Sequence, residues 1–199
     1  MPSVHVHLVR HGESTWNRER RLQGQSVHPP LTDLGREQAR AAADTLAALL
    51  AADPGPTELW SSDLVRAART AAVVGTRLRL PVRHDEALRE QSLGTLEGRL
   101  TRDLRPVPTP TGQHVGEVRW GGGESTADVH IRVGRFLTRE LRPPRPGIRH
   151  LVLVSHGDTI RVARAWLLGR THRELDWDDL PNGSVTTVTA RPYTEVTGV

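Results

Sequence analysis

The sequence predicts an α/β fold, namely a three-layer α/β/α sandwich around a mostly parallel sheet. Strand-like segments alternate with helix-like segments along the whole chain of 199 residues. The segment 150–155 is almost continuously apolar, which is typical of a strand buried inside a parallel sheet. The length fits one domain, and no internal repeat divides residues 1–199.

The first half of the chain begins with a strand over residues 4–9. A helix is expected over 32–50, because Thr32 is a suitable N-cap and apolar residues then recur at helical spacing. The Asp-Pro-Gly-Pro sequence at 53–56 ends that helix. The elements expected next are a strand at 57–60, a helix at 63–78 and a short extended segment at 81–88.

The second half begins with residues 99–123, which are rich in proline, threonine and glycine and have no periodicity. This composition predicts a loop or lid. A helix is expected over 124–141, with Ser125 and Asp128 placed as a capping box. The remaining elements are a proline-rich turn at 143–147, the strand at 150–155, a helix at 159–168 and a closing strand at 184–190.

The composition excludes several classes of protein. Cysteine is absent, so disulfides, thiolate catalysis and cysteine-based metal sites are ruled out. No segment approaches the roughly 18 apolar residues of a membrane span, and the N-terminus lacks the pattern of a signal peptide. We therefore expect a cytoplasmic protein without a membrane partner.

The charged residues favour a local anion site over a nucleic-acid surface. All 27 basic residues are arginine, which also fits a GC-rich coding sequence, and the formal net charge is only +4. The arginines are mixed with 23 acidic residues and form no basic block. We therefore expect no nucleic-acid partner and a pocket of arginines for a small anionic ligand.

Uncommon residues gather where the predicted strands end. Arg10 and His11 follow the first strand, His156 follows the strand at 150–155, and Arg66 lies in the helix after the second strand. Ligands of open α/β sheets bind beyond the carboxyl ends of the strands. Helices that begin there also direct their positive N-termini toward this edge. We therefore expect a site for a dianion, and a phosphoryl group is the obvious one.

Two histidines could instead hold a metal ion. However, neighbouring arginines would repel a cation, and each histidine is followed by glycine rather than placed at helical His-x-x-x-His spacing. We therefore expect no metal and no other cofactor. The alternative is nucleophilic catalysis, in which a neutral imidazole attacks phosphorus while arginines hold the phosphoryl oxygens. Arginines lower the pKa of such an imidazole below its ordinary value of about 6.5.

These residues belong to a longer series of motifs. The segment Leu8–Asn17 resembles the signature of the histidine phosphatase superfamily, the phosphoglycerate-mutase-like proteins. The resemblance covers nearly the whole chain and continues in order through Arg21–Gly24, Leu31–Gly35, Ser61–Ala67, Glu90–Gly98, Gly122–Ser125, Val154–Gly157 and Asn182–Val185. It implies the phosphoglycerate-mutase-like form of the predicted fold.

The resemblance also implies roles for matched residues. His11 is the nucleophile that becomes phosphohistidine, and Glu90 is the general acid that protonates the leaving oxygen and then activates water. The other implied site residues are Arg10, Arg66 and His156 in the phosphate pocket, Asn17 and the Gly157 N–H at the phosphoryl group, and Gln23 and Gly24 at the pocket mouth.

Some of these roles have alternatives. Asn17 could only cap its local turn, and the family varies its acid. Three other carboxylates lie near the relevant loops and are alternative candidates for the general acid, namely Glu13, Asp85 and Glu86. Glu97 is expected to be structural, and most histidines outside the motifs are expected to be surface or partly buried side chains. His28 is the exception, because it lies near the expected pocket mouth and is a candidate for contact with substrate.

Departures from the mutase pattern favour a phosphatase. The segment 99–123 is short where cofactor-dependent mutases carry an extended insert, and Gln23 and Ser92 fall in places where the mutase pattern differs. The resemblance therefore implies a metal-independent phosphomonoesterase of the histidine acid phosphatase type, acting on a small phosphomonoester. A phosphoglycerate-mutase-type phosphotransferase and a non-catalytic phosphate-binding regulator are the alternatives. The identity of the substrate and the formation of a homodimer stay open.

Overall fold

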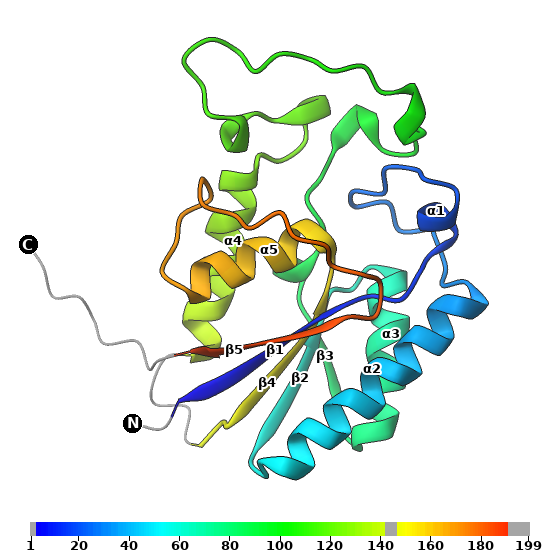
Figure 1. Ribbon diagram of the computed structural model, residues 1–199, viewed down its shortest axis with the longest axis vertical. Helices are drawn as coiled ribbons and strands as arrows, with labels where there is room; N and C mark the ends of the chain where they lie inside the picture. Colours follow the sequence, from blue (N-terminus) through cyan, green and yellow to red (C-terminus); the bar gives the residue numbers. More distant parts are fainter. Residues whose placement is uncertain (1–2, 142–146, 191–199) are drawn as a thin grey trace, which may run out of the picture.

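The computed structural model describes residues 3–141 and 147–190. Within these residues five strands form one sheet in the order β3-β2-β4-β1-β5. The strands are β1 (Val4–Arg10), β2 (Thr57–Ser61), β3 (Val82–His84), β4 (His150–Ser155) and β5 (Val185–Ala190). β5 pairs antiparallel with β1, and every other pairing is parallel. The predicted fold class is therefore confirmed (Figure 1).

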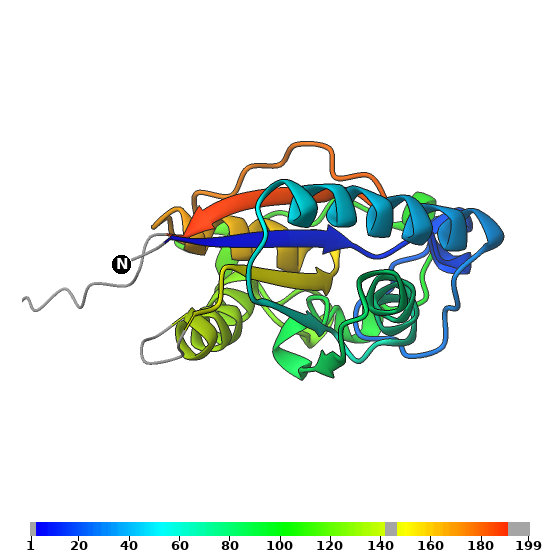
Figure 2. The same ribbon diagram turned by 90° about the horizontal axis from the view of Figure 1, so that it is seen from below.

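Helices cover both faces of the sheet. One face packs against α2 (Asp33–Ala52) and α3 (Val65–Leu78), and the other against α4 (Thr126–Leu141) and α5 (Gly157–Leu167). Figure 2 shows α2 running alongside β1 and β5. None of the helices in the described ranges is both long and apolar enough to cross a membrane.

β4 lies between β1 and β2, and all of its residues are buried. Val152 and Val154 pack toward α2 and α3, whereas Leu151 and Leu153 pack toward α4 and α5. Both faces of a central parallel strand are covered, which explains the continuous apolar pattern. Because β1, β2 and β4 are parallel, their C-terminal ends reach the same edge of the sheet.

Some predicted boundaries are wrong by a few residues. α5 begins at Gly157 rather than at 159, because His156 is its N-cap. α4 begins at Thr126 rather than at 124, and the predicted capping box is present, because Ser125 and Asp128 bond each other's backbone N–H groups. The sequence does not predict α1 (Thr15–Arg18) or the 3₁₀ turns inside 99–123, since such short elements have no periodicity. Of the turn at 143–147, residues 143–146 lie outside the described residues.

Two glycines bring the end of β1 against the start of α2. A Cβ on Gly12 would lie 2.1 Å from the carbonyl oxygen of Gly35, and a Cβ on Gly35 would lie 2.0 Å from that of Glu13. Thr32 caps α2 by accepting the Gly35 N–H at 3.0 Å. The helix therefore fixes the backbone around His11 through direct contact between main chains.

His7 and His150 are buried, 2% exposed each, although the sequence analysis predicts surface or partly buried side chains. Nε2 of His150 donates to the carbonyl oxygen of Asp53 at 2.7 Å, so its Nδ1 accepts from Nε2 of His7 at 3.0 Å. Nδ1 of His7 then accepts from the Thr187 hydroxyl at 2.9 Å. This chain of hydrogen bonds is complete when both rings are neutral.

Acid should therefore destabilise the fold through His7. Burial and the neighbouring His150 and His5 lower the pKa of His7 to about 4. In the unfolded chain His7 binds a proton near pH 6.5. Its contribution to the free energy of unfolding is therefore present above that pH and is lost as the pH falls toward 4. The linked loss is about 3 kcal/mol. Urea unfolding between pH 7 and 4 should show a smaller pH dependence for His7→Asn than for wild type. Exposed His84→Asn is the control, and equal slopes for His7→Asn and wild type would contradict this assignment.

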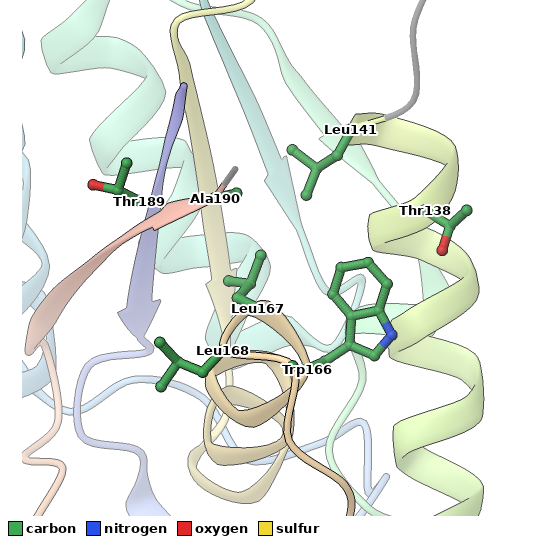
Figure 3. Close-up of a pocket in the computed structure, with 8 residues that line it drawn as sticks. Thr138, Leu141, Trp166, Leu167, Leu168, Thr189 and Ala190 are labelled. Carbon is green, nitrogen blue, oxygen red and sulfur yellow. The ribbon is translucent and has the colours of Figure 1, made fainter. Parts of the chain in front are cut away.

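α4 and α5 pack closely because α4 has a glycine where the Trp166 ring crosses it. Figure 3 shows the pocket at the ends of these helices and of β5, with Trp166 pointing from α5 toward α4. A Cβ on Gly134 would lie 2.6 Å from the indole Nε1 of Trp166. The missing side chain thus makes room for the indole.

Gly134→Ala should destabilise the protein by about 1–3 kcal/mol, because the added methyl group overpacks the contact with Trp166. In an open helix the same change stabilises by up to about 1 kcal/mol. Thermal unfolding of Gly134→Ala measures the effect. The penalty should be smaller in a Trp166→Leu background, and a penalty of unchanged size would exclude the indole as its cause.

Candidate active site

His11 follows β1 directly and is almost fully buried. Its Nδ1 lies 2.7 Å from the carbonyl oxygen of Gly12. A carbonyl oxygen only accepts, so Nδ1 carries the proton and the lone pair is on Nε2. Burial, and next the charge of Arg66, hold the pKa of His11 well below its ordinary value. The ring is therefore neutral, with Nε2 unprotonated.

His156 caps the start of α5 and lies beside His11, with the two ring centroids 5.0 Å apart. Its Nε2 is 2.9 Å from the hydroxyl oxygen of Ser62, which accepts the Leu64 N–H. The Ser62 hydroxyl can therefore donate to Nε2, which leaves the proton of a neutral His156 on Nδ1. Burial and the charge of Arg66 lower the pKa of His156 well below its ordinary value.

Two arginines provide the positive charge of this edge. Arg66, 1% exposed, donates from Nη2 to the carbonyl oxygen of Gly24 at 2.7 Å and from Nη1 to that of Ser26 at 2.9 Å. Burial lowers the pKa of Arg66 to about 10, which leaves it protonated at neutral pH. Arg10 donates from Nη1 to the carbonyl oxygen of Leu180. Both guanidinium groups are thus held by backbone carbonyls.

Four buried side-chain nitrogens within the described ranges have no hydrogen-bond partner: Arg10 Nε, Arg66 Nε, His156 Nδ1 and Arg161 Nε. Buried N–H groups are rarely left unpaired in proteins. The first three belong to the predicted phosphate pocket, and Arg161 is close by, since a Cβ on Gly157 would lie 3.3 Å from its Nη1 and 3.8 Å from Arg10 Nε. The site therefore presents clustered N–H donors suited to an anion with several oxygens.

Glu90 lies at the N-terminus of α5. Its carboxylate accepts the N–H of Thr159 at 3.2 Å and the N–H of Gln91 at 3.0 Å, while the Thr159 hydroxyl donates to the carbonyl oxygen of Arg89 at 2.7 Å. Its negative charge acts on both Arg10 and Arg66 and raises their pKa values, against the stronger effect of burial. The structure thus brings the predicted general acid to the same sheet edge as the two arginines.

Asn17, Gln23 and Gly24, also predicted for the site, have contacts within the protein. Asn17 completes the capping box of α1 with the N-cap Ser14, because its Oδ1 accepts the Ser14 N–H at 3.0 Å. Gln23 accepts the Ser14 hydroxyl at 2.7 Å. Gly24 contributes its carbonyl oxygen to Arg66. The alternative that Asn17 serves as a local cap therefore has direct geometric support.

Glu97 holds the segment that carries Gly24. Its carboxylate accepts the N–H groups of Gln25 at 3.0 Å and Leu93 at 3.1 Å and the Ser26 hydroxyl at 3.1 Å. These contacts match the structural role expected for Glu97.

Two groups of supporting residues have no counterpart in the predicted site. Arg132 pairs with Glu124 at 2.9 Å and donates to the carbonyl oxygen of Glu90 at 3.0 Å, which fixes the backbone of the predicted acid. Asn182 donates from Nδ2 to the carbonyl oxygen of His11 at 3.0 Å. Glu124 and Asn182 lie in the motifs Gly122–Ser125 and Asn182–Val185. No other feature of the sequence indicates these supporting contacts.

No group of three or more His, Asp or Glu side chains in residues 3–141 and 147–190 is arranged to hold a metal ion. The geometry instead provides an imidazole with a free lone pair, donors for an anion and the carboxylate of Glu90. Such a set can transfer a phosphoryl group to nitrogen and protonate an oxygen.

Comparisons with known proteins identify the family of the chain. The family model of the histidine phosphatase superfamily (branch 1) matches residues 6–197. The probable phosphoglycerate mutase GpmB of Salmonella paratyphi C is 37% identical over 170 residues, which cover 83% of this chain and 75% of that protein.

Solved structures of the same kind superimpose on the chain. A mycobacterial glucosyl-3-phosphoglycerate phosphatase in complex with VO3 has a TM-score of 0.77 and 33% identity over 92% of each chain. The protein described as mycobacterial hydrolase 1 has a TM-score of 0.79 and 30% identity, covering 94% of this chain and 91% of its own. From the match over residues 6–197 it follows that this chain belongs to the histidine phosphatase superfamily, branch 1.

Proposed function

We propose that this protein is a phosphatase that hydrolyses phosphomonoesters through a phosphohistidine on His11. The observation that carries the proposal is the buried, neutral imidazole of His11 beside the unpaired N–H donors of Arg10, Arg66 and His156. These donors match the oxygens of a phosphoryl group, and Nε2 is free to attack phosphorus.

In the first step Nε2 of His11 forms a bond to phosphorus, and the bond from phosphorus to the ester oxygen breaks. The carboxyl group of Glu90 gives its proton to the leaving oxygen, and an alcohol departs. The arginines and His156 stabilise the charge on the three equatorial oxygens. The His11–Gly12 hydrogen bond keeps the imidazole oriented throughout.

In the second step the Glu90 carboxylate takes a proton from water, and the water oxygen attacks phosphorus. The bond from phosphorus to Nε2 breaks, inorganic phosphate leaves, and Glu90 is protonated again. The N–H groups of Thr159 and Gln91 orient the carboxylate in both steps. Atoms and protons balance to one ester and one water giving one alcohol and one phosphate.

The similarity to a probable phosphoglycerate mutase favours a second candidate, transfer of the phosphoryl group between two hydroxyl groups of one molecule. Both activities use the same phosphohistidine, and they differ in whether water or an alcohol accepts the phosphoryl group. The similarity to a phosphatase over 92% of both chains supports hydrolysis. Following 3-phosphoglycerate by NMR separates the two, because only a mutase produces 2-phosphoglycerate.

Phosphate release from a panel of phosphomonoesters in the presence of EDTA tests the proposal. His11→Ala should lower kcat by at least about 10³-fold, and removal of one donor in Arg66→Ala by about 10²–10³-fold. Exposed His84→Ala is the matched control and should keep the wild-type rate. Rapid acid-free quenching should trap phosphohistidine in wild type and in His84→Ala but not in His11→Ala. Full activity in His11→Ala would exclude the mechanism.

The role of Glu90 has its own signature. Glu90→Gln should slow the hydrolysis of ethyl phosphate by about 10²–10⁴-fold, because the leaving ethanol oxygen must be protonated. The first step with 4-nitrophenyl phosphate should lose far less, because the nitrophenolate leaves without one. Burst-phase kinetics of nitrophenol release isolate that step. Equal losses for the two esters would assign Glu90 to positioning rather than proton transfer.

The low pKa of His11 predicts activity that persists into acid. The nucleophile must be neutral, and its folded-state pKa lies well below 6.5, so kcat/KM should not fall through protonation of His11 near pH 6.5. In Arg66→Met the nearby positive charge is gone, so the pKa of His11 should rise toward its ordinary value. NMR titration of ¹³C-labelled histidine measures the pKa of His11 in wild type and in Arg66→Met. The exposed Arg69→Met variant is the control. A His11 midpoint near 6.5 in wild type would contradict the electrostatic argument.

A further inference from the structure

A cavity of about 790 Å³ lies next to the candidate active site. Gln91 and Asp158 line it, and they directly follow Glu90 and Gly157 in the chain. The Asp158 N–H also points to the Glu90 carboxylate, at 3.4 Å. The cavity therefore begins where the alcohol part of a phosphomonoester would lie. Its size is in the range that holds a ligand with many more atoms than a phosphate group.

The walls of this cavity combine apolar and polar side chains. They include side chains that are otherwise unusual on a protein surface, namely Leu104, Val107 and Val115 from the segment 99–123 and Trp177 from the loop after α5. Trp177 is 68% exposed. Figure 1 shows the segment 99–123, in green, arching beyond the end of the sheet. Exposed apolar side chains gathered around one cavity mark a binding surface.

Trp177 connects the cavity to the phosphate pocket. The Arg161 guanidinium lies 5.3 Å from the centroid of the Trp177 ring, a cation–π contact. Arg161 also pairs with Asp158 at 3.3 Å and lies beside Gly157 and Arg10. The indole therefore lies where the cavity meets the phosphate pocket, close to the expected position of the alcohol part of the substrate.

Charged residues of both signs line the cavity. They are Arg99, Arg105, Asp103 and Asp158, together with Arg173, which pairs with Glu117. A second anionic group on the substrate would meet both signs of charge there. The apolar part of the wall, rather than a uniform charge, is therefore the feature that can select a ligand.

We infer that the substrate is a phosphomonoester of an alcohol with a bulky, mainly apolar body, such as an aromatic ring, which packs against Trp177 and Leu104. This inference rests on the proposed function and adds the class of the leaving group. The segment 99–123 then acts as the wall of a leaving-group pocket.

Ethyl phosphate and 2-phenylethyl phosphate test the inference, because both release a primary alcohol of similar acidity and differ in the apolar body. Phosphate release should give a kcat/KM at least about tenfold higher for the phenylethyl ester, as expected for burial of an aromatic ring. 3-Phosphoglycerate is the anionic comparison and should be a poorer substrate than the phenylethyl ester.

Variants then locate the preference. Trp177→Ala and Leu104→Ala should each reduce the ratio of the two kcat/KM values several-fold. Leu49→Ala on α2 is a matched control, since Leu49 is 38% and Leu104 36% exposed, and it should keep the ratio. Thermal unfolding of each variant confirms that it is folded.

The outcomes separate the two proposals. Equal kcat/KM for the ethyl and phenylethyl esters, or a ratio unchanged in both cavity variants, would overturn the inference and leave the phosphatase in place. A preference for 3-phosphoglycerate that disappears in Arg105→Ala would also overturn it, in favour of a second anion site. No hydrolysis of these esters or of 4-nitrophenyl phosphate would refute the proposed function, and the inference with it.

Discussion

Burial of the Arg66 guanidinium is the constraint on which the candidate active site depends. Within the described residues this cation makes no ion pair, and its direct partners are the carbonyl oxygens of Gly24 and Ser26. A buried charge is unfavourable unless it is compensated. The compensation comes from dipoles, from the more distant carboxylates of Glu90 and Glu97, and from any anion that binds. Burial of the imidazoles, and next the positive field of Arg66, lower the pKa values of His11 and His156 and keep both rings neutral. One buried cation thus contributes both to the state of the imidazoles and to the preference of the site for an anion.

The surroundings of Arg66 come from distant parts of the chain. Gly24, in the loop at 23–26, contacts Arg66 although the two residues are 42 positions apart in the chain. Glu97, from a third segment, accepts a hydrogen bond from that loop. Asn182 supports the His11 carbonyl across 171 residues. Contacts of such sequence separation form only when the sheet is assembled. The anion-binding geometry is therefore a property of the completed fold and not of any local motif.

Much of the sheet edge could be predicted, because the informative residues directly follow strands in the sequence. Arg10, His11 and His156 need only the strand pattern and the rule that parallel strands end at one edge. The supports could not be predicted in this way. Nothing in the local pattern of Arg132 shows that its guanidinium reaches the backbone of Glu90. His7 and His150 are 143 residues apart and meet only through the pairing of β1 with β4.

The apolar wall on 99–123 escaped prediction for a similar reason. Leu104 and Val107 are isolated between prolines and polar residues, so no periodicity connects them. Only the folded chain brings them near Trp177, which follows in sequence by about seventy residues. The irregular conformation of the segment was predictable from its composition, but the surface that it creates was not.

The contact between Gly12 and Gly35 has a consequence for the motions of the protein. Main chain meets main chain there, so His11 cannot swing away unless β1 and the start of α2 separate. Separating them breaks the helix cap and the edge of the core, which amounts to opening the whole domain. Amide hydrogens around His11, such as that of Gly12 bonded to Thr70 at 3.1 Å, should exchange with solvent only through global unfolding. The ring that is poised for chemistry thus belongs to the slowest-exchanging part of the molecule, while residues 101–113 in the wall of the cavity are exposed and free to exchange early.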